Sequence, residues 1–449
     1  MSDSNSSADC RAPLRIAIAG LGTVGVGVIR LIDTNRDLIS ARAGRPLEVV
    51  AVSARDSAKD RGVDLTPYAW VDDMTDLAAR DDVDVVLELV GGSEGPALEL
   101  SRATLDAGKG LVTANKAMIA HHGLALAELA EGKDAALKFE AAVAGGIPVV
   151  KGLREGTSAN ALTRIYGILN GTSNYILSEM EETGADFAET LEEAQKLGYA
   201  EADPTFDIEG VDAAHKLAIL AAIGFGARVD FDAVRVTGIT RVRSADIAQA
   251  DALGFVIRLI AMADVEADGN GQGKVTPHLL QRVRPCLVAK DHPLASVDGP
   301  TNAVVAEGNF SGRLLFQGAG AGDGPTASAV VADVIDIARD EVGAPFSIPV
   351  SQLEPLPAAE PGHRMERTYL RFTVADRPGV LAEITAAMRD ADVSIESLIQ
   401  QGRANENSEA LLAMVTHEGP EQNVQKALAL LDGSDSLTAS PLVLPILRS

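Results

Sequence analysis

Cysteine is scarce in this sequence. The 449 residues contain only Cys10 and Cys286, which lie far apart and lack C-x-x-C spacing. A disulfide framework or a structural zinc site is therefore disfavoured, and a reducing cytoplasm fits the composition. Neither residue has the setting of a nucleophile, because Cys10 falls in a loose polar tail and Cys286 stands beside a proline. Chemistry through a cysteine thioester is disfavoured as well.

Positive charge and long apolar runs are also scarce. The formal net charge is −25, and like charges repel, so nucleic acid and anionic membrane surfaces are disfavoured as partners. No stretch approaches the roughly 18 uninterrupted apolar residues of a membrane span. The first residues, "MSDSNSSADCRAP", lack the basic flank and apolar run of a signal peptide. We therefore expect an intracellular, cytoplasmic protein whose partner is a small molecule.

Apolar strands alternating with helices fill the first third of the chain. "PLRIAIAGLGTVGVGVIRLID" reads as strand, glycine turn and helix, and "LEVVAVSA", "VDVVLELVGG", "KGLVTANK" and "LKFEAAVAGG" follow as further strands. Continuously apolar strands separated by helices predict a parallel sheet that is covered on both faces. We therefore expect a doubly wound, Rossmann-type α/β domain over residues 14–150.

The rest of the chain divides into four regions. Residues 151–317 mix helical and strand-like segments, which predicts an α+β domain. A glycine-rich loop and a long amphipathic helix in 318–350 could pack back on the first domain. Residues 351–366 are dense in proline and polar side chains, as is typical of a linker. Residues 367–449 read as strand, turn, helix and strand, then another strand and helix, a pattern of their own.

The segment "GLGTVG" places Gly20, Gly22 and Gly25 in G-x-G-x-x-G spacing, directly after a strand and at the start of a helix. The first glycine permits the tight turn, the second lets the backbone approach a pyrophosphate, and the third allows close helix–sheet contact. The pattern predicts a dinucleotide site. Further candidates for its lining are the loop residues Leu21, Thr23 and Val24 and, at the ends of later strands, Gly91, Gly92, Thr113 and Lys116.

The second strand ends in "VSARD", without an immediate acidic residue for the ribose hydroxyls of NAD. Arg55 could instead meet the 2′-phosphate of NADP, or it could be an ordinary exposed arginine. The choice between NADP and NAD stays open at this point.

Two lysines are candidates for proton transfer. Lys116 in "VTANKAM" follows a strand at the edge where open α/β sheets bind ligands. Lys216 follows Asp212 by four residues in "VDAAHKLAILAA", so the two share a face if the segment is helical. An exposed pair of this kind stabilises a helix only slightly. This helix, however, is very apolar, and its start is expected to enter a core.

The stretch "AQKLGYAEADPTFDIEGVDAAHK" resembles the diagnostic motif of homoserine dehydrogenases. The matching positions are Ala194, Gly198, Asp203, Pro204, Asp207, Ile208, Gly210, Asp212 and Lys216. "GLGTVG", "TANK", "NGTSNYIL" and "GAGAGDGPTASAV" also resemble the family in its order, so the resemblance covers roughly residues 14–350. It implies NADP- or NAD-dependent interconversion of L-homoserine and L-aspartate 4-semialdehyde, in a homodimer or homotetramer.

The resemblance also implies roles for single residues. Glu201 matches the position that binds the substrate ammonium group, and Lys216, oriented by Asp212, matches the lysine that transfers the proton. Lys116 would hold the substrate or share the acid–base work, and Asp207 would border the substrate and fix the loop. Gly198 matches a backbone contact to cofactor or substrate, and Gly320 or Gly322 would close over the cofactor.

The family often binds a monovalent cation, Na⁺ or K⁺, near "EAAVAGGIP". The matching positions are Glu140, Val143, Gly145 and Ile147, most of them contributing backbone carbonyls. The same residues could equally form a plain turn before Pro148.

"VADRPGVLAEITAAMRDADVSIESL" resembles an ACT domain, a βαββαβ module that senses amino acids, and this resemblance implies a small ferredoxin-like C-terminal domain. Such domains place their ligand at the turn into the first helix, so the candidate allosteric residues are Asp376, Gly379 and Val380. This implies feedback by an amino acid, with L-threonine as the expected effector. A structural or oligomerising role is the alternative.

Two other functions compete with this interpretation. A sensor of nucleotide and amino acid would not need the set of Glu201, Asp212, Lys216 and Lys116. A dehydrogenase of 2-hydroxy acids usually presents a catalytic histidine, and His215, the only histidine near the motif, points one position away from Lys216.

Overall fold

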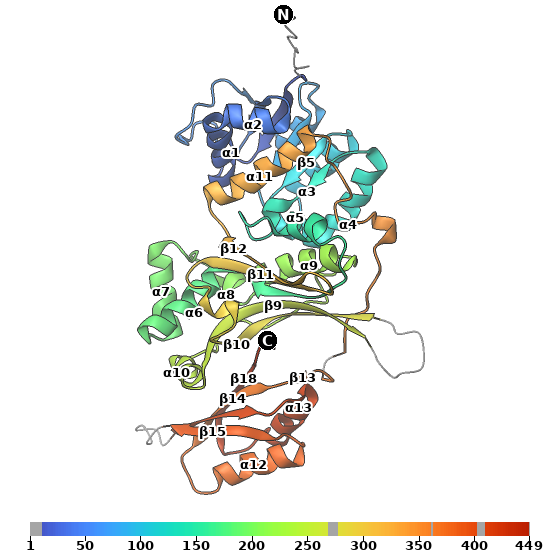
Figure 1. Ribbon diagram of the computed structural model, residues 1–449. Coiled ribbons are helices and arrows are strands. Elements are labelled where there is room, and N and C mark those ends of the chain that lie inside the picture. The colour runs from blue at the N-terminus through green and yellow to red at the C-terminus, as the bar shows by residue number, and fades with distance from the viewer. Residues whose placement is uncertain (1–10, 268–276, 361, 402–408, 449) are drawn as a thin grey trace, which may run out of the picture.

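The computed structural model describes residues 11–267, 277–360, 362–401 and 409–448. Cys10 lies outside the described residues. The chain forms three units stacked along one axis, with the N-terminal unit at one end, a mixed sheet in the middle and a small unit at the other end (Figure 1).

The N-terminal unit is built on a six-stranded parallel sheet in the order β3-β2-β1-β4-β5-β6. Its strands are β1 (Leu14–Ala19), β2 (Leu47–Ser53), β3 (Ala69–Trp70), β4 (Val85–Glu88), β5 (Gly110–Thr113) and β6 (Leu137–Lys138). Every residue of β4 and β5 is buried, as expected for strands covered on both faces. The strand order reverses between β1 and β4, which is where doubly wound sheets bind ligands.

Helices cover both faces of this sheet. They are α1 (Thr23–Thr34), α2 (Arg36–Ala43), α3 (Pro96–Asp106), α4 (Lys116–Lys133) and, from much later in the chain, α11 (Asp323–Ala338). Helix α11 returns to lie beside α1 (Figure 1). Gly27 permits this approach, since a β-carbon there would lie 2.8 Å from the carbonyl oxygen of Asp323.

The central unit is a mixed sheet in the order β12-β11-β7-β9-β10-β8. Its strands are β7 (Leu162–Ile168), β8 (Arg235–Val236), β9 (Phe255–Ala267), β10 (Pro277–Ala289), β11 (Thr301–Gly308) and β12 (Gly312–Ala319). The accompanying helices are α5 (Val149–Lys151), α6 (Gly171–Thr183), α7 (Phe187–Leu197), α8 (Thr205–Ile208), α9 (Val211–Phe225) and α10 (Ser244–Ala252). Helix α9 is buried at every position from Asp212 to Ile223, as its all-round apolar sequence predicts.

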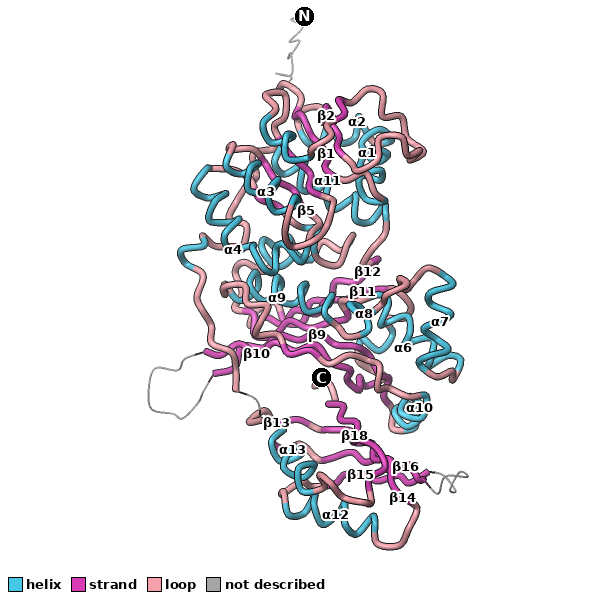
Figure 2. The backbone as a smooth tube through the Cα atoms, turned by 180° about the vertical axis from the view of Figure 1, so that it is seen from behind, coloured by secondary structure: helices cyan, strands magenta, loops and turns pink. Residues whose placement is uncertain are grey.

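The C-terminal unit has the order β14 (Thr368–Ala375), α12 (Val380–Asp390), β15 (Ile395–Gln401), β16 (Glu409–Thr416), α13 (Glu421–Leu430) and β18 (Leu437–Pro445). The four strands form an antiparallel sheet in the order β15-β16-β14-β18, and α12 and α13 share one core against it (Figure 2). This is the βαββαβ arrangement of the ferredoxin-like fold, so the predicted fold class is confirmed for all three units.

Three separate segments cover the outer edge of β10: β8, the segment predicted as a linker, and the C-terminus. The backbone of Ala358 pairs with Leu279, β8 pairs with Arg282 and Val283, and Ile446 pairs with Leu287. The short strands β13 (Met365–Glu366) and β17 (Gly419–Pro420) pair nearby. Covering an edge strand removes a template for unwanted strand pairing. Among the helices that the described residues form, none combines the length and apolarity needed to cross a membrane.

Candidate active site

A cavity of 1230 Å³ opens between the N-terminal sheet and the central unit. It lies beside the carboxyl edge of the parallel strands, at the predicted position. The predicted site residues that line it are Val24, Lys116, Gly145, Gly198, Glu201, Asp207, Asp212, Lys216, Gly320 and Gly322. The fold thus gathers residues that are up to about three hundred positions apart into one site that is large enough for a cofactor and a small substrate.

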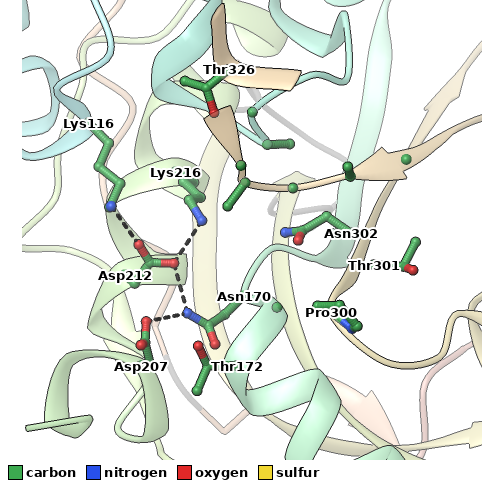
Figure 3. Close-up of a pocket in the computed structure, with 18 of the residues that line it drawn as sticks. Lys116, Asn170, Thr172, Asp207, Asp212, Lys216, Pro300, Thr301, Asn302 and Thr326 are labelled. Atoms are coloured by element: carbon green, nitrogen blue, oxygen red, sulfur yellow. Dashed lines mark hydrogen bonds and ion pairs between the residues drawn. The ribbon is translucent and has the colours of Figure 1, made fainter. Parts of the chain in front are cut away.

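Asp212 is the centre of this site (Figure 3). Its Oδ1 forms an ion pair with Lys116 Nζ at 2.8 Å, and its Oδ2 accepts a hydrogen bond from Lys216 Nζ at 2.7 Å. Only 6% of Asp212 and 9% of Lys216 is exposed. The i,i+4 pair predicted from the sequence is therefore a buried pair at the cavity wall, not a surface ion pair.

Lys216 has two of its hydrogen-bonding positions fixed by the protein. Its Nζ donates to the backbone carbonyl of Leu169 at 2.7 Å as well as to Asp212. Burial lowers the pKa of Lys216, and the Asp212 carboxylate opposes that shift only in part. An ammonium group has three N–H donors, whereas a neutral amine has two donors and a lone pair. The one remaining position of Nζ, donor or lone pair, is thus left for the cavity.

Lys116 and Asp212 are held in their charged forms. Burial alone would lower the pKa of Lys116, but the carboxylates of Asp212, Asp207 and Glu201 outweigh it and raise that pKa. Burial would likewise raise the pKa of Asp212, but Lys216 and Lys116 outweigh it and hold that pKa far below its usual range. The two lysines therefore differ, because only Lys216 is shifted toward the neutral form.

The acidic loop before α9 supplies the other wall of the site. Gly198 ends α7 with a φ of +80°, a left-handed conformation that suits glycine. Glu201 is exposed at the cavity, where an ammonium group could reach it. Asp203 accepts hydrogen bonds from the backbone N–H and the hydroxyl of Thr205 and so shapes the start of α8.

The glycine-rich loop has the geometry that its spacing predicts. Gly20 has a φ of +102°, and a β-carbon there would lie 2.6 Å from the carbonyl oxygen of Leu89. A β-carbon on Gly25 would lie 2.0 Å from the carbonyl oxygen of Gly20. No side chain caps the start of α1 at Gly22, and a β-carbon there would meet open space. The loop therefore offers free backbone N–H groups to an anion.

Comparisons with known proteins agree with this geometry. A family model described as "Homoserine dehydrogenase" matches residues 148–335, and one described as "Homoserine dehydrogenase, NAD binding domain" matches 20–140. The homoserine dehydrogenase of Pseudomonas aeruginosa is 41% identical over 432 residues, which cover 95% of this chain and 97% of that protein. This chain belongs to the homoserine dehydrogenase family.

Other relatives extend the likeness to the whole chain. The homoserine dehydrogenase of Corynebacterium glutamicum is 42% identical over 434 residues, covering 96% of this chain and 95% of that protein. The crystal structure of a homoserine dehydrogenase from Thiobacillus denitrificans matches with a TM-score of 0.89 at 39% identity, covering 97% and 98% of the two chains. A hyperthermophilic archaeal homoserine dehydrogenase in complex with NADPH matches with a TM-score of 0.62 at 26% identity, covering 74% of this chain and 99% of that one. An "ACT domain" model matches residues 368–433.

Three predicted cofactor residues, Gly91, Gly92 and Thr113, are not among the residues that line the cavity. Gly91 and Gly92 have φ values of +86° and +90°, as a tight loop requires. The Thr113 hydroxyl donates to the buried Glu88 at 2.6 Å, and Glu88 also accepts the backbone N–H groups of Val90 and Gly91. Glu88 thus joins the two loops at the ends of β4 and β5. No sequence signal pointed to it, because the contact that joins the loops, with Thr113, comes from another strand.

The residues after β2 lie outside the cavity lining. Arg55 is exposed on this loop. Arg61 folds back, and its Nε donates to the carbonyl of Leu21 in the glycine loop at 3.1 Å, while its Nη1 and Nη2 donate to the carbonyls of Lys59 and Asp56. Nothing in the sequence indicated that Arg61 contacts the glycine loop, because no motif marks an arginine at this position after β2.

The predicted cation site is a buried turn. The Glu140 carboxylate accepts the backbone N–H groups of Val150 and Lys151 at 2.9 and 2.8 Å. Burial, reinforced by Asp333, raises the pKa of Glu140 to about 7. Gly145 has a φ of +52°, and a β-carbon there would lie 2.5 Å from the carbonyl oxygen of Gly320. Within the described ranges, no three His, Cys, Asp or Glu side chains gather in a way that could hold a metal.

The remaining candidates lie away from the cavity. His215 stacks on Phe231 with ring centroids 4.4 Å apart, and burial, with His121 nearby, lowers its pKa to about 4. Burial raises the pKa of the Cys286 thiol to about 11, so it is no ready nucleophile. In the C-terminal unit, Asp376 and Gly379 are exposed, and Gly379 starts α12 with a φ of +99°, whereas Val380 is buried.

Proposed function

We propose that this chain interconverts L-homoserine and L-aspartate 4-semialdehyde with NADP or NAD. The observation that carries the proposal is the arrangement of Lys216, whose amine is bonded to Asp212 and Leu169 and keeps one position for the cavity. That position suits transfer of one proton to or from a substrate oxygen.

The chemistry follows from the two protonation states of Lys216. In the oxidation, the neutral amine takes the proton of the homoserine hydroxyl while a hydride leaves the carbon that bears it. In the reduction, the ammonium form gives a proton to the aldehyde oxygen as the hydride arrives. The nicotinamide cofactor, when bound, accepts or supplies that hydride. Asp212 fixes the amine and stabilises its cationic form.

The acidic loop suits the rest of the substrate. Glu201 offers a carboxylate to the substrate ammonium group, and Asp207 lies at the same wall. Lys116 remains an ammonium group beside Asp212 and supplies a positive charge that can hold the substrate.

The direct test follows the absorbance of NADPH with L-aspartate 4-semialdehyde. We expect the wild-type chain to turn over and Lys216→Ala to lose on the order of 10²–10⁴-fold in kcat. Lys196→Ala is the matched control, because Lys196 is an exposed lysine of α7. An unchanged rate in Lys216→Ala would remove the proton-transfer role. The absence of turnover in the wild type would favour a sensor.

We further propose that Arg55 favours NADP by meeting the 2′-phosphate. The loop that carries it is tied to the glycine loop by Arg61, so Arg55 follows a fixed turn. Arg55→Ala is expected to raise KM for NADPH about tenfold while KM for NADH stays the same. Equal changes for both cofactors would contradict this assignment.

For regulation, we propose L-threonine as the effector of the ACT domain, bound near Asp376, Gly379 and Val380. The ACT sheet is in contact with the central unit, since Arg371 and Tyr369 of β14 donate to Asp246 of α10 at 2.7 and 3.0 Å. Threonine added to the assay is expected to slow turnover. Insensitivity would leave the ACT domain a role in assembly, where a homodimer or homotetramer is expected.

A further inference from the structure

Asn170 lies between β7 and α6, directly before the first residue of α6. It is 3% exposed and is the N-cap residue of α6, because its Oδ1 accepts the backbone N–H of Ser173 at 2.8 Å. This cap uses only the oxygen of the side-chain amide. Its nitrogen points into the active site (Figure 3).

The amide nitrogen bridges two carboxylates of the site. Asn170 Nδ2 donates to Asp207 Oδ1 at 2.7 Å and to Asp212 Oδ2 at 2.9 Å. The same Asp212 oxygen accepts Lys216 Nζ at 2.7 Å. An NH₂ group has two donors, and both are used here.

The residue before it completes the arrangement. Leu169 supplies the backbone carbonyl that accepts the other hydrogen bond of Lys216 Nζ. Two consecutive residues, Leu169 and Asn170, therefore fix both members of the Lys216–Asp212 pair. Since the amide is neutral, it holds two carboxylates together without adding to the charges that face Lys216. Those charged or titratable groups are Asp212 and His215 of α9, Lys116 of α4 and Asp207 of α8.

We propose that Asn170 is a positioning residue for the proton transfer, whose amide holds the Asp207 and Asp212 carboxylates so that Asp212 orients Lys216 toward the substrate oxygen. The inference rests on the proposed role of Lys216. It differs from a capping role, which would need only the amide oxygen.

Asn170→Asp separates the two roles. Aspartate caps a helix as well as asparagine does, so α6 is expected to stay intact. It has no N–H donors, however, and it places a third carboxylate beside Asp207 and Asp212. We expect kcat to fall on the order of 10²-fold, because the pair loses its orientation. A carboxylate nearby also favours the cation, so the pKa of Lys216 should rise by about one unit or more.

The readout is the pH dependence of homoserine oxidation, in which the base form of Lys216 is active. For Asn170→Asp, the pH at which kcat/KM rises should increase by the same amount as the pKa of Lys216. Asn170→Ser also keeps the cap but cannot bridge the carboxylates and adds no charge. It should lower kcat about tenfold or more and leave the position of the rise unchanged.

Asn174→Ser is the control for a purely structural effect. Asn174 is also buried in α6, but its amide donates to the backbone carbonyls of Val297 and Gly299 instead of the site. This variant should lower Tm without moving the pH dependence. The proposal is overturned if Asn170→Asp keeps the wild-type kcat and pH dependence, or if both Asn170 variants lose only Tm. Failure of the wild type to turn over would instead overturn the proposed function.

Discussion

Asp212 and Glu140 are both buried carboxylates at the junction of the first two units, with 6% and 2% of their surfaces exposed, yet their pKa values shift in opposite directions. Asp212 contacts two ammonium groups and an amide. Glu140 contacts two backbone N–H groups, and Asp333, whose pKa burial raises to about 6, is its neighbour. The partners, not the burial, decide which carboxylate keeps its charge.

The difference has a functional consequence. Asp212 is one carboxylate in contact with two ammonium groups. Lys216 can therefore gain and lose a proton while Lys116 stays charged. Around Glu140, Lys151 lies 2.7 Å from Asp336 but 3.9 Å from Asp333, and the charges of Lys151, Arg154 and Lys138 lower the pKa of Asp333 without outweighing its burial. We propose that a monovalent cation binds near Glu140, Val143, Gly145 and Ile147, because burial raises the pKa values of two neighbouring carboxylates there, Glu140 and Asp333.

Removing the charge of Asp212 should have the largest effect. Asp212→Asn leaves Lys116 and Lys216 facing each other without a carboxylate, so the pKa of Lys216 should fall further and its orientation should be lost. We expect kcat to drop on the order of 10²–10³-fold, with the pH rise of homoserine oxidation moved to lower pH. Asp203→Asn is the control, because Asp203 is exposed and its carboxylate accepts hydrogen bonds from Thr205 and not from a lysine of the site. A wild-type rate in Asp212→Asn would contradict the account.

Glu140 should instead affect the pH dependence of stability. Its folded pKa of about 7 lies above the unfolded value of 4.5, so the folded state binds the extra proton between these values. The free energy of unfolding should therefore fall as pH rises through this window, by on the order of 3 kcal/mol. Urea denaturation at pH 5 and pH 8 measures the change, and Glu140→Gln should remove the part that Glu140 contributes, leaving the smaller fall due to Asp333, whose pKa is raised to about 6.

Urea denaturation also tests whether a monovalent cation binds near Glu140. At pH 8, Na⁺ or K⁺ should restore stability to the wild type relative to a bulky organic cation, and should do so less in Glu140→Gln. Glu155→Gln is the control, because Glu155 is a nearby exposed carboxylate. Equal stabilisation of the wild type and Glu140→Gln would place the ion elsewhere.

A third buried carboxylate, Asp246, sharpens the comparison at the ACT interface. Burial raises its pKa although Arg371 is bonded to it. Tyr369→Phe removes one donor to Asp246 and should cost about 1 kcal/mol of stability, the smallest of these effects. Threonine inhibition should weaken, and kcat without threonine should stay the same. In an Asp246→Asn background the cost should shrink, which a double-mutant cycle measures. Full additivity would show that the pair is not coupled.

The sequence predicted the parts of the site that lie within one local segment. The glycine loop and the Asp212–Lys216 pair follow from fixed spacing in a strand–turn–helix and in a helix. The contacts between segments did not follow. Lys116 reaches Asp212 from another helix, and Asn170 reaches carboxylates 37 and 42 positions away. The Lys116 contact forms where the first two units meet, and the Asn170 contacts form where α8 and α9 pack beside the start of α6 within the central unit. No local pattern records which side chains meet at such places.

The most direct measurement is the pH dependence of kcat/KM for homoserine oxidation, compared between the wild type and Lys216→Met. The lowered pKa of a buried lysine predicts that the wild-type rate rises with pH through a value below the ordinary lysine value of 10.5. The variant should be slower on the order of 10²-fold or more and should lack that rise. The same rise in Lys216→Met would show that another group takes the proton and would contradict the account.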